Sequence, residues 1–459
     1  MRYFYAFLLL ALVTACAGSD PIIPTVSMPT ETTEPATIPA TSTSTNIPPT
    51  ATVASTPSPV PSPTIITSPT TVPIRQSDGH SRSPEISGDG RYIAFLSRGK
   101  LTENSIHDAE SLYIYDQETD QVELVSVALD GYSSKGRAFH IALSSSGRYV
   151  GFHSHGGDLV SGDDELCDNG WSNCADLFIY DRQRKQMTRI PHGTPTGETG
   201  RDYPWVTFSP DEQFFYTLGS MVQDSSNFYD LNTYEPVFPD PMIEYLLPDG
   251  LTARFWNSEA DDREKLFNAS ELLNLGHSSG GGTVVAFSSM PEDLTDKSIN
   301  LCEDVTWNAE GLRPCFNIFI HNLETGETRL ATVDSDGWSS NADTSWPMMS
   351  ANGRFLIFHS AATNLTDDDF PQCNYEYDCR SSNVFLYDVE TGKTILISRD
   401  VDTDLPAGSS RIGDISGDGR YITFFSEAEN LVHGDTNKVS DIFLYDRLTQ
   451  EIVRISNPN

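Results

Sequence analysis

Positively charged residues are scarce in this sequence. It contains 29 lysines and arginines against 65 aspartates and glutamates, which gives a net charge of −36. A surface with this balance repels phosphate backbones and anionic lipid headgroups, so the composition argues against nucleic-acid binding. Cations and cationic surfaces are the natural counterparts of such a chain.

Familiar catalytic motifs are missing as well. The sequence has no HExxH zinc motif, no GxSxG nucleophile motif, no P-loop and no GxGxxG dinucleotide motif. A carboxylate pair for glycoside cleavage stays open because any two of the 65 acidic residues could converge, yet nothing favours a particular pair. We therefore favour a function other than catalysis and assign no catalytic residue.

Cysteine is used sparingly, and six of the seven cysteines form couples separated by short polar stretches. No couple has the CxxC spacing of a metal-binding pair. We expect three local disulfides formed in an oxidising compartment, rather than buried free thiols. The expected pairs are Cys167–Cys174, Cys302–Cys315 and Cys373–Cys379.

The apolar stretch at the N-terminus, from Tyr3 to Val13, is too short to span a bilayer but is typical of an export signal. The sequence Val13-Thr14-Ala15-Cys16 that ends it resembles the lipobox of bacterial lipoproteins. The resemblance implies that residues 1–15 are a signal peptide and that Cys16 is lipidated, which would hold the exported protein at a membrane surface. An ordinary signal followed by a chance cysteine is the alternative.

A tract without glycine, lysine or arginine follows. From Asp20 to Pro73, 54 residues include 15 Thr, 7 Ser and 13 Pro. Such a tract cannot bury a core and favours extended polyproline II conformations. We expect residues 16–77 to be a disordered tether between the anchor and a folded domain at 78–459.

A repeated pattern begins after Asp78, in which a hairpin such as ISGDGRYIAF is followed by a second apolar run such as SLYIYD. The hairpin recurs at Ile86–Phe95, Leu143–Phe152, Phe208–Thr217, Met349–Phe358 and Ile415–Phe424, with a weaker copy at Gly276–Phe287 and a further candidate at Leu246–Phe255. The second run recurs at Ser111–Asp116, Asp176–Asp181, Asn317–Asn322, Asn383–Asp388 and Asp441–Asp446. Each second run precedes a polar turn and another β-rich run, so each repeat predicts four antiparallel strands.

Four-stranded units of this length are typical of propeller blades, so the sequence predicts an all-β propeller. We favour seven blades, or six if the segment around Leu246 belongs to one long blade. The hairpin followed by D-[IV]-[FY]-[LV]-Y-D and a Thr-Gly turn resembles the TolB-type repeat, a relative of the WD repeat. The resemblance covers roughly Asp78 to Asn459 and implies a β-propeller but no single activity, because such propellers occur alone and attached to peptidases. The last expected strand ends close to Asn459, so we expect no catalytic domain after the propeller.

Long acidic loops are expected on one face of the propeller. In an up-and-down blade, the connections between strands two and three share a face with the connections between blades, and we call this face the loop face. Residues 155–175, 290–316 and 361–382 lie there, are rich in Asp and Glu, and each contain one cysteine couple. Disulfides would restrict these loops for recognition, or would merely tie down exposed insertions, and the two explanations carry similar weight.

Oxygen ligands at short spacing between strands two and three of two repeats suit calcium, the one cofactor that the sequence suggests. The candidate ligands are Asp435, Asn437 and Asp441 in the last repeat, and Asp163, Glu165 and Asp176 in the second. The pattern lacks the glycine and the terminal glutamate of an EF-hand loop. Asp441 could instead accept hydrogen bonds from backbone amides at the start of its strand.

Aromatic residues in the connections between blades are candidate ligand contacts, namely Trp338, Tyr132 and Tyr203. We interpret Trp205 and Trp346 as core residues between blades. The equivalent His153 and His359 are interpreted as packing residues of the repeat. A leucine recurs early in the loops, at Leu101, Leu159, Leu294, Leu365 and Leu431, and is also expected to pack between blades.

Together these features favour an exported, membrane-tethered propeller that acts as a binding or scaffolding module through its acidic, disulfide-bearing loop face. Its ligand would be a protein, a peptide or a glycan. A glycan-active hydrolase or lyase on the same face, or a structural protein of the cell envelope, are the alternatives. The sequence does not indicate an oligomeric state.

Overall fold

A computed structural model describes residues 79–163, 175–190, short segments between 205 and 290, and 297–303, 312–322, 325–368, 370 and 382–456. The chain divides into two units, Met1–Pro69 and Thr70–Asn459, and all described residues belong to the second. The expected signal peptide (1–15), Cys16 and the tether (16–77) lie outside the described residues. No helix in the described segments is long and apolar enough to cross a membrane.

Antiparallel sheets of four strands dominate the described residues, which hold six of them, each built from strands in sequence order. The first sheet contains β1 (Ser81–Ile86), β2 (Tyr92–Ser97), β3 (Ser111–Asp116) and β4 (Gln121–Leu124). The second contains β5 (Ala138–Leu143), β6 (Tyr149–Ser154), β7 (Asp176–Asp181) and β8 (Gln186–Ile190). The third contains β9 (Trp205–Phe208), β10 (Phe214–Leu218), β11 (Asn227–Asp230) and β12 (Pro236–Val237).

The remaining four-stranded sheets follow the same order along the chain. One contains β15 (Gly276–Ser278), β16 (Val284–Ser289), β19 (Asn317–Asn322) and β20 (Thr328–Leu330). The next contains β21 (Thr344–Met349), β22 (Phe355–Ser360), β23 (Asn383–Asp388) and β24 (Lys393–Leu396). The last contains β25 (Ser410–Ile415), β26 (Tyr421–Ser426), β27 (Asp441–Asp446) and β28 (Glu451–Arg454). These sheets match propeller blades and confirm the predicted fold class.

Two shorter sheets complete the list of described strands. The candidate repeat at Leu246–Phe255 does form a hairpin, in which β13 (Met242–Leu246) pairs with β14 (Thr252–Trp256). Among the described residues this hairpin gains no third strand, so the choice between seven and six blades stays a prediction. The second hairpin pairs β17 (Leu301–Glu303) with β18 (Leu312–Pro314) inside the loop between β16 and β19.

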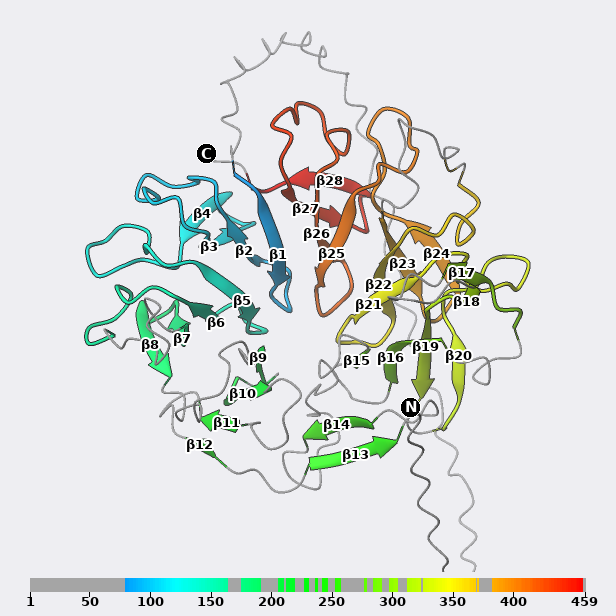
Figure 1. The fold of residues 1–459 in the computed structure, drawn as a ribbon, viewed down its shortest axis with the longest axis horizontal. Helices are drawn as coiled ribbons and strands as arrows, with labels where there is room; N and C mark the ends of the chain where they lie inside the picture. Colours follow the sequence, from blue (N-terminus) through cyan, green and yellow to red (C-terminus); the bar gives the residue numbers. More distant parts are fainter. Residues whose placement is uncertain are drawn as a thin grey trace, which may run out of the picture. The chain divides into compact units, whose positions relative to one another are not determined.

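Aromatic pairs at equivalent positions fill the core of each well-described blade. A ring from the second strand stacks on a ring from the third strand, with centroids 5.4 to 5.9 Å apart. The pairs are Phe95–Tyr113, Phe152–Phe178, Phe287–Phe319, Phe358–Phe385 and Phe424–Phe443. Because each fully buried ring contributes roughly 1.5–3 kcal/mol, this repeated stack explains why the apolar runs fold as strands two and three. In Figure 1 the first strands of the sheets lie toward the middle of this unit and the fourth strands toward its periphery.

The first and last sheets meet without sharing a strand, because β25 to β28 are all consecutive in the chain. Backbone hydrogen bonds join them, from Ser81 N to Ser440 O at 2.7 Å and from Gly417 N to Gly88 O at 2.9 Å. The carboxylate of Asp414 also accepts from Ile86 N at 3.1 Å. Burial at this junction raises the pKa of Asp414 to about 6.

Candidate functional site

Three connections between blades present an apolar side chain at the same place on the loop face. Each connection is closed by an isolated β-bridge, at Val127–Ser133, Val333–Ser339 and Arg399–Pro406. The residue before the second bridge partner is exposed in each case, with Tyr132 45%, Trp338 47% and Leu405 37% exposed. Tyr132 and Trp338 were expected as ligand contacts, whereas Leu405 was not. We call these three side chains the apolar tips.

Aspartates within the connections fix the backbone that carries the tips. The Oδ1 atom of Asp334 accepts hydrogen bonds from the N–H groups of Asp336 at 3.0 Å and Trp338 at 2.8 Å. Asp130 Oδ1 accepts in the same way from Tyr132 N at 3.1 Å. These short Asx-type turns give each tip a defined direction although the side chain itself is exposed.

Asp400 occupies the position of Asp334 in the last connection, and its carboxylate also accepts hydrogen bonds from nearby backbone N–H groups. Burial would raise its pKa, but the N–H groups of Thr403 and Asp402 and the amide of Asn430 donate to its carboxylate. These hydrogen bonds hold the pKa of Asp400 below its ordinary value. The carboxylate is therefore a structural acceptor in its ionised form, not a proton donor.

Loops between the second and third strands support the connections from the side. Asn364 Nδ2 donates to Asp334 Oδ2 at 2.9 Å, and Asn430 Nδ2 donates to Asp400 Oδ2 at 2.6 Å. Asp158, at the equivalent position in the second blade, accepts from Ser134 Oγ at 2.5 Å. The residue after each of these three is a buried leucine, namely Leu159, Leu365 or Leu431. The recurring leucine of the first blade, Leu101, is buried as well. The packing interpretation of these leucines is confirmed, while Leu294 lies outside the described residues.

One of the three expected disulfides lies in the described part of the chain. Cys302 and Cys315 are bonded with their Cα atoms 4.9 Å apart, across the base of the β17–β18 hairpin. The other two pairs, Cys167–Cys174 and Cys373–Cys379, lie outside the described residues. The confirmed bond is consistent with the oxidising compartment expected from the sequence.

The expected calcium ligands of the last blade come together around an arginine. Arg454 Nη1 lies 2.7 Å from Asp435 Oδ1 and 3.6 Å from Asp441 Oδ2, and its side chain is only 4% exposed. Asn437 Nδ2 donates to Asp441 Oδ2 at 2.8 Å, and Ser456 Oγ donates to Asp441 Oδ1 at 2.5 Å. The cation beside these carboxylates is therefore a guanidinium, which leaves calcium as a prediction that the geometry disfavours.

The second blade repeats this arrangement. Arg189 Nε lies 3.5 Å from Asp163 Oδ1, and its Nη2 lies 3.2 Å from Asp176 Oδ1. Glu165, the remaining expected ligand, lies outside the described residues. Arg189 pairs with Phe178 as Arg454 pairs with Phe443, so both arginines occupy one position of the repeat. No group of three or more His, Cys, Asp or Glu residues is arranged to hold a metal ion in the described segments.

The burial expected for His153 is confirmed, whereas the burial expected for Trp346 is wrong. His153 is fully buried beside Phe139, as the packing interpretation requires. Trp346 was expected in the core but is 42% exposed, with a left-handed φ of 58°. It lies where β21 shifts register against β22, so the bulge turns the side chain out of the core. Trp205 is placed in β9, and Tyr203 lies outside the described residues.

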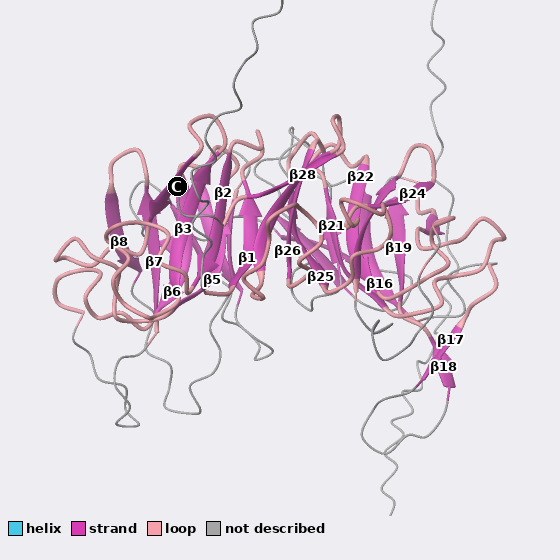
Figure 2. Cartoon of the chain, turned by 90° about the horizontal axis from the view of Figure 1, so that it is seen from above, coloured by secondary structure: helices cyan, strands magenta, loops and turns pink. Residues whose placement is uncertain are grey.

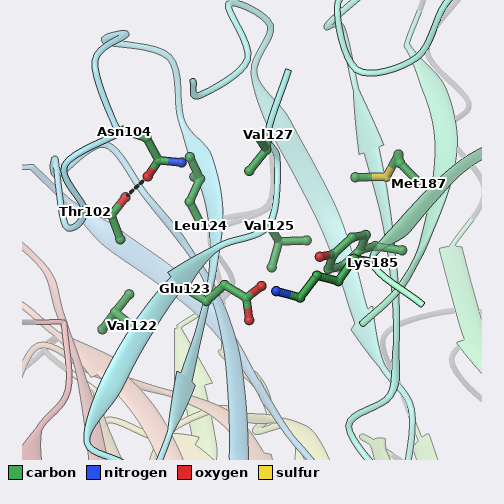
Figure 3. Close-up of a pocket in the computed structure, with 10 residues that line it drawn as sticks. Thr102, Asn104, Val122, Glu123, Leu124, Val125, Val127, Lys185 and Met187 are labelled. Carbon is green, nitrogen blue, oxygen red and sulfur yellow. Dashed lines mark hydrogen bonds between the residues drawn. The ribbon is translucent and has the colours of Figure 1, made fainter. Parts of the chain in front are cut away.

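A groove of about 590 Å³ lies between the outer strands of the first two blades. Its lining residues are Thr102, Asn104, Val122, Glu123, Leu124, Val125, Val127, Tyr180, Lys185 and Met187. Figure 3 shows Glu123 and Lys185 pointing toward each other, with valine side chains around them. A wall of mixed polar and apolar side chains with a single opposed charge pair offers no set of converging catalytic groups.

Comparisons with known proteins find no family and only distant likenesses among solved structures. No family model and no curated protein sequence matches the chain. The solved structures that match include TolB from Acinetobacter baumannii, with 13% identity, a TM-score of 0.32, and coverage of 69% of this chain and 53% of that chain. The propeller domain of the Trilobed protease from Pyrococcus furiosus matches with 11% identity, a TM-score of 0.46, and coverage of 83% and 96%.

An enzyme is also among these structures. Oligogalacturonate lyase from Vibrio parahaemolyticus matches with 12% identity, a TM-score of 0.42, and coverage of 82% of this chain and 92% of that chain. The chain spans about half the length of the TolB chain that it matches. At these levels the likeness carries no argument about activity, and the propeller assignment rests on the sheets themselves.

Proposed function

We propose that this protein is an exported, membrane-tethered binding or scaffolding module that recognises a partner protein through its loop face. The observation that carries the proposal is the set of apolar tips, which are exposed at one equivalent position while their backbone is held by hydrogen bonds. Rigid exposed aromatic and aliphatic side chains lose little conformational entropy on binding. They are therefore suited to act as anchors of an interface.

The chemistry around the tips supports a polypeptide partner with basic groups. Asp402 and Asp404 are 75% and 84% exposed beside Leu405, and Asp130 and Asp336 flank the other two tips. Apolar anchors with acidic surroundings complement a surface that combines apolar and basic side chains. Attachment through lipid on Cys16 remains part of the proposal, because it would hold the protein at a membrane surface.

Affinity purification of the full-length protein from its native envelope tests this function. Three variants are compared with the wild type, namely Trp338→Ala, Tyr132→Ala and the control Leu448→Ala. Leu448 is 64% exposed in the turn between β27 and β28, which lies on the opposite face. We expect partners retained by the wild type and the control to be lost from both tip variants. An identical set of partners in all four samples would contradict the loop face as the binding surface.

A further inference from the structure

Two arginines at the loop-face ends of β1 and β5 share one carboxylate. Arg82 makes a two-pronged ion pair with Glu110, in which Nε donates to Oε1 at 2.7 Å and Nη2 donates to Oε2 at 2.9 Å. Arg137 Nε donates to the same Oε2 atom at 2.8 Å. Figure 2 shows β1 and β5 as neighbouring strands, and Glu110 directly precedes β3. The two guanidinium groups therefore meet where the first blade joins the second.

The glutamate departs from the pattern of the repeat. The residue before the third strand is a serine in the last two blades, Ser382 and Ser440, and each hydroxyl donates to a backbone carbonyl of the next blade. The backbone carbonyl of Glu110 still accepts from Ala138 N at 2.8 Å, as the two serine carbonyls accept from the blades that follow them. The junction between blades therefore forms without a carboxylate, and the side chain of Glu110 serves to hold the arginines.

Glu110 is a fixed anion. Its side chain is only 5% exposed, and burial would raise its pKa, but the hydrogen bonds and charges of Arg82 and Arg137 hold that pKa below the ordinary value. The ionised carboxylate neutralises one of the two guanidinium groups. One positive charge is left over, in a chain whose net charge is −36.

The guanidinium of Arg137 is the open end of this cluster. Its side chain is 52% exposed, and neither Nη1 nor Nη2 donates a hydrogen bond to any residue that the structure describes. The guanidinium carbon lies 5.8 Å from the centroid of the Phe139 ring, and the ring of His155 lies 5.2 Å from the same centroid. His155 N donates to Arg137 O at 3.1 Å, so these two residues face each other across adjacent strands. Phe139 is 7% exposed and supports both side chains.

The neighbouring His140 responds to the excess positive charge. Burial lowers the pKa of its imidazole, and the charges of Arg82 and Arg137 lower it further. The field at this histidine is therefore positive although Glu110 is bound to both arginines.

We propose that the guanidinium of Arg137, with His155 beside it, binds a single oxyanion, namely a carboxylate or phosphate group of a small molecule. The two free terminal nitrogens of a planar guanidinium match two oxygens of such a group. Arg82 and Glu110 are positioning residues, because they hold Arg137 through its Nε and leave the terminal nitrogens open. One uncompensated charge suits one anionic group, and the acidic chain as a whole repels polyanions. The site uses none of the apolar tips, so it goes beyond the proposed function and does not depend on it.

Fluorine NMR titrations of the full-length protein with three aromatic probes test the ligand chemistry. The probes are para-fluorobenzoate, para-fluorophenyl phosphate and the neutral para-fluorobenzamide. We expect at least one anionic probe to bind roughly tenfold more tightly than the benzamide, and the tighter of the two identifies the oxyanion. Equal affinity for all three probes would overturn the proposal, because the ring and not the anion would then be recognised. Absence of binding by both anionic probes would overturn it as well.

Variants test the location. We expect Arg137→Gln to weaken binding of the tighter probe roughly tenfold, because the fork and the excess charge are lost together. The control Lys393→Gln removes one exposed positive charge from β24 and should leave the affinity unchanged. A folded Arg137→Gln variant, shown by its melting temperature, that binds like the wild type would overturn the site. If that variant does not fold, Arg137→Lys keeps the charge beside Glu110 without the planar fork, and wild-type affinity in it would overturn the site equally.

Discussion

The ring of Tyr421 in the last blade packs against the backbone of Gly90 in the first blade, so closely that a Cβ atom on the glycine would overlap it. The same relationship joins Tyr92 to Gly147 and Phe355 to Gly419. Each glycine sits in the hairpin turn of one blade, and each ring begins the second strand of the preceding blade. The glycine of the repeated hairpin turn is therefore a contact between blades as well as a turn residue, which the sequence alone did not indicate.

Replacing Gly419 by alanine should destabilise the propeller by more than turn strain alone. Gly419 has φ of 72°, which costs an alanine about 1–2 kcal/mol, and the collision with Phe355 adds roughly 1–3 kcal/mol. Gly326 is the matched control because its φ is 70° but its missing Cβ would meet nothing within 4 Å. Chemical denaturation of Gly419→Ala and Gly326→Ala measures the difference. Equal losses would show that the ring moves aside freely.

Arg454→Leu should strongly destabilise the last blade. The arginine is the cation for the buried Asp435 and Asp441, whose pKa values are raised by burial, and removing one member of such a group costs about 3–5 kcal/mol. Leu396 occupies the same position in the preceding blade, so leucine fits the strand. Adding Asp435→Asn and Asp441→Asn should restore much of the loss in urea unfolding, because no buried charge then remains unpaired.

Thermal melts with and without calcium distinguish a calcium site at Asp435 and Asp441 from a pair of carboxylates neutralised by Arg454. With Arg454 as the resident cation, melts of the wild type in calcium and in chelator should coincide. A melting temperature raised by calcium would show that a metal ion binds the native state in addition to the arginine.

The pH dependence of stability should reveal Asp414. Its pKa is raised to about 6 in the folded protein, above the value of about 3.9 expected in the unfolded chain. The folded state therefore holds this proton over roughly pH 4 to 6 where the unfolded state has lost it, and stability falls as pH rises through that window. The free energy of unfolding of the wild type minus that of Asp414→Asn should decrease between pH 4 and pH 6. A difference that is flat or rises would contradict the assignment.

Lipidation of Cys16 can be checked by mass. We expect membrane-extracted protein to begin at Cys16 and to carry two or three acyl chains, and Cys16→Ser to be released from the membrane fraction. A stable attachment needs more than one acyl chain, so the number of chains is part of the prediction. An unmodified N-terminus at another residue would remove the anchor from the account.

The architecture was predictable because it depends on local patterns that repeat. The apolar runs, Asp-Gly turns and recurring loop leucines specify strands and packing in each copy, and the copies reinforce one another. Cysteine spacing likewise predicted the Cys302–Cys315 bond. These features need only neighbours in the sequence to be interpreted.

The details of the loop face depend on partners distant in the chain. Arg454 reaches Asp435 and Asp441 because β28 pairs with β27, and no sequence spacing identifies that arginine as their cation. Leu405 was missed because its connection is one residue longer than that of Trp338 and lacks the aromatic residue that marked the others. The exposure of Trp346 follows from a bulge whose position the apolar pattern does not encode.

Site-specific photo-cross-linking in intact cells tests the central claim most directly. A benzophenone side chain is placed in turn at Tyr132, Trp338 and Leu405, and at Leu448 as the control on the opposite face. The account predicts discrete cross-linked partner bands from the three loop-face positions and none from position 448. Bands only from position 448, or from no position at all, would contradict a binding function of the loop face.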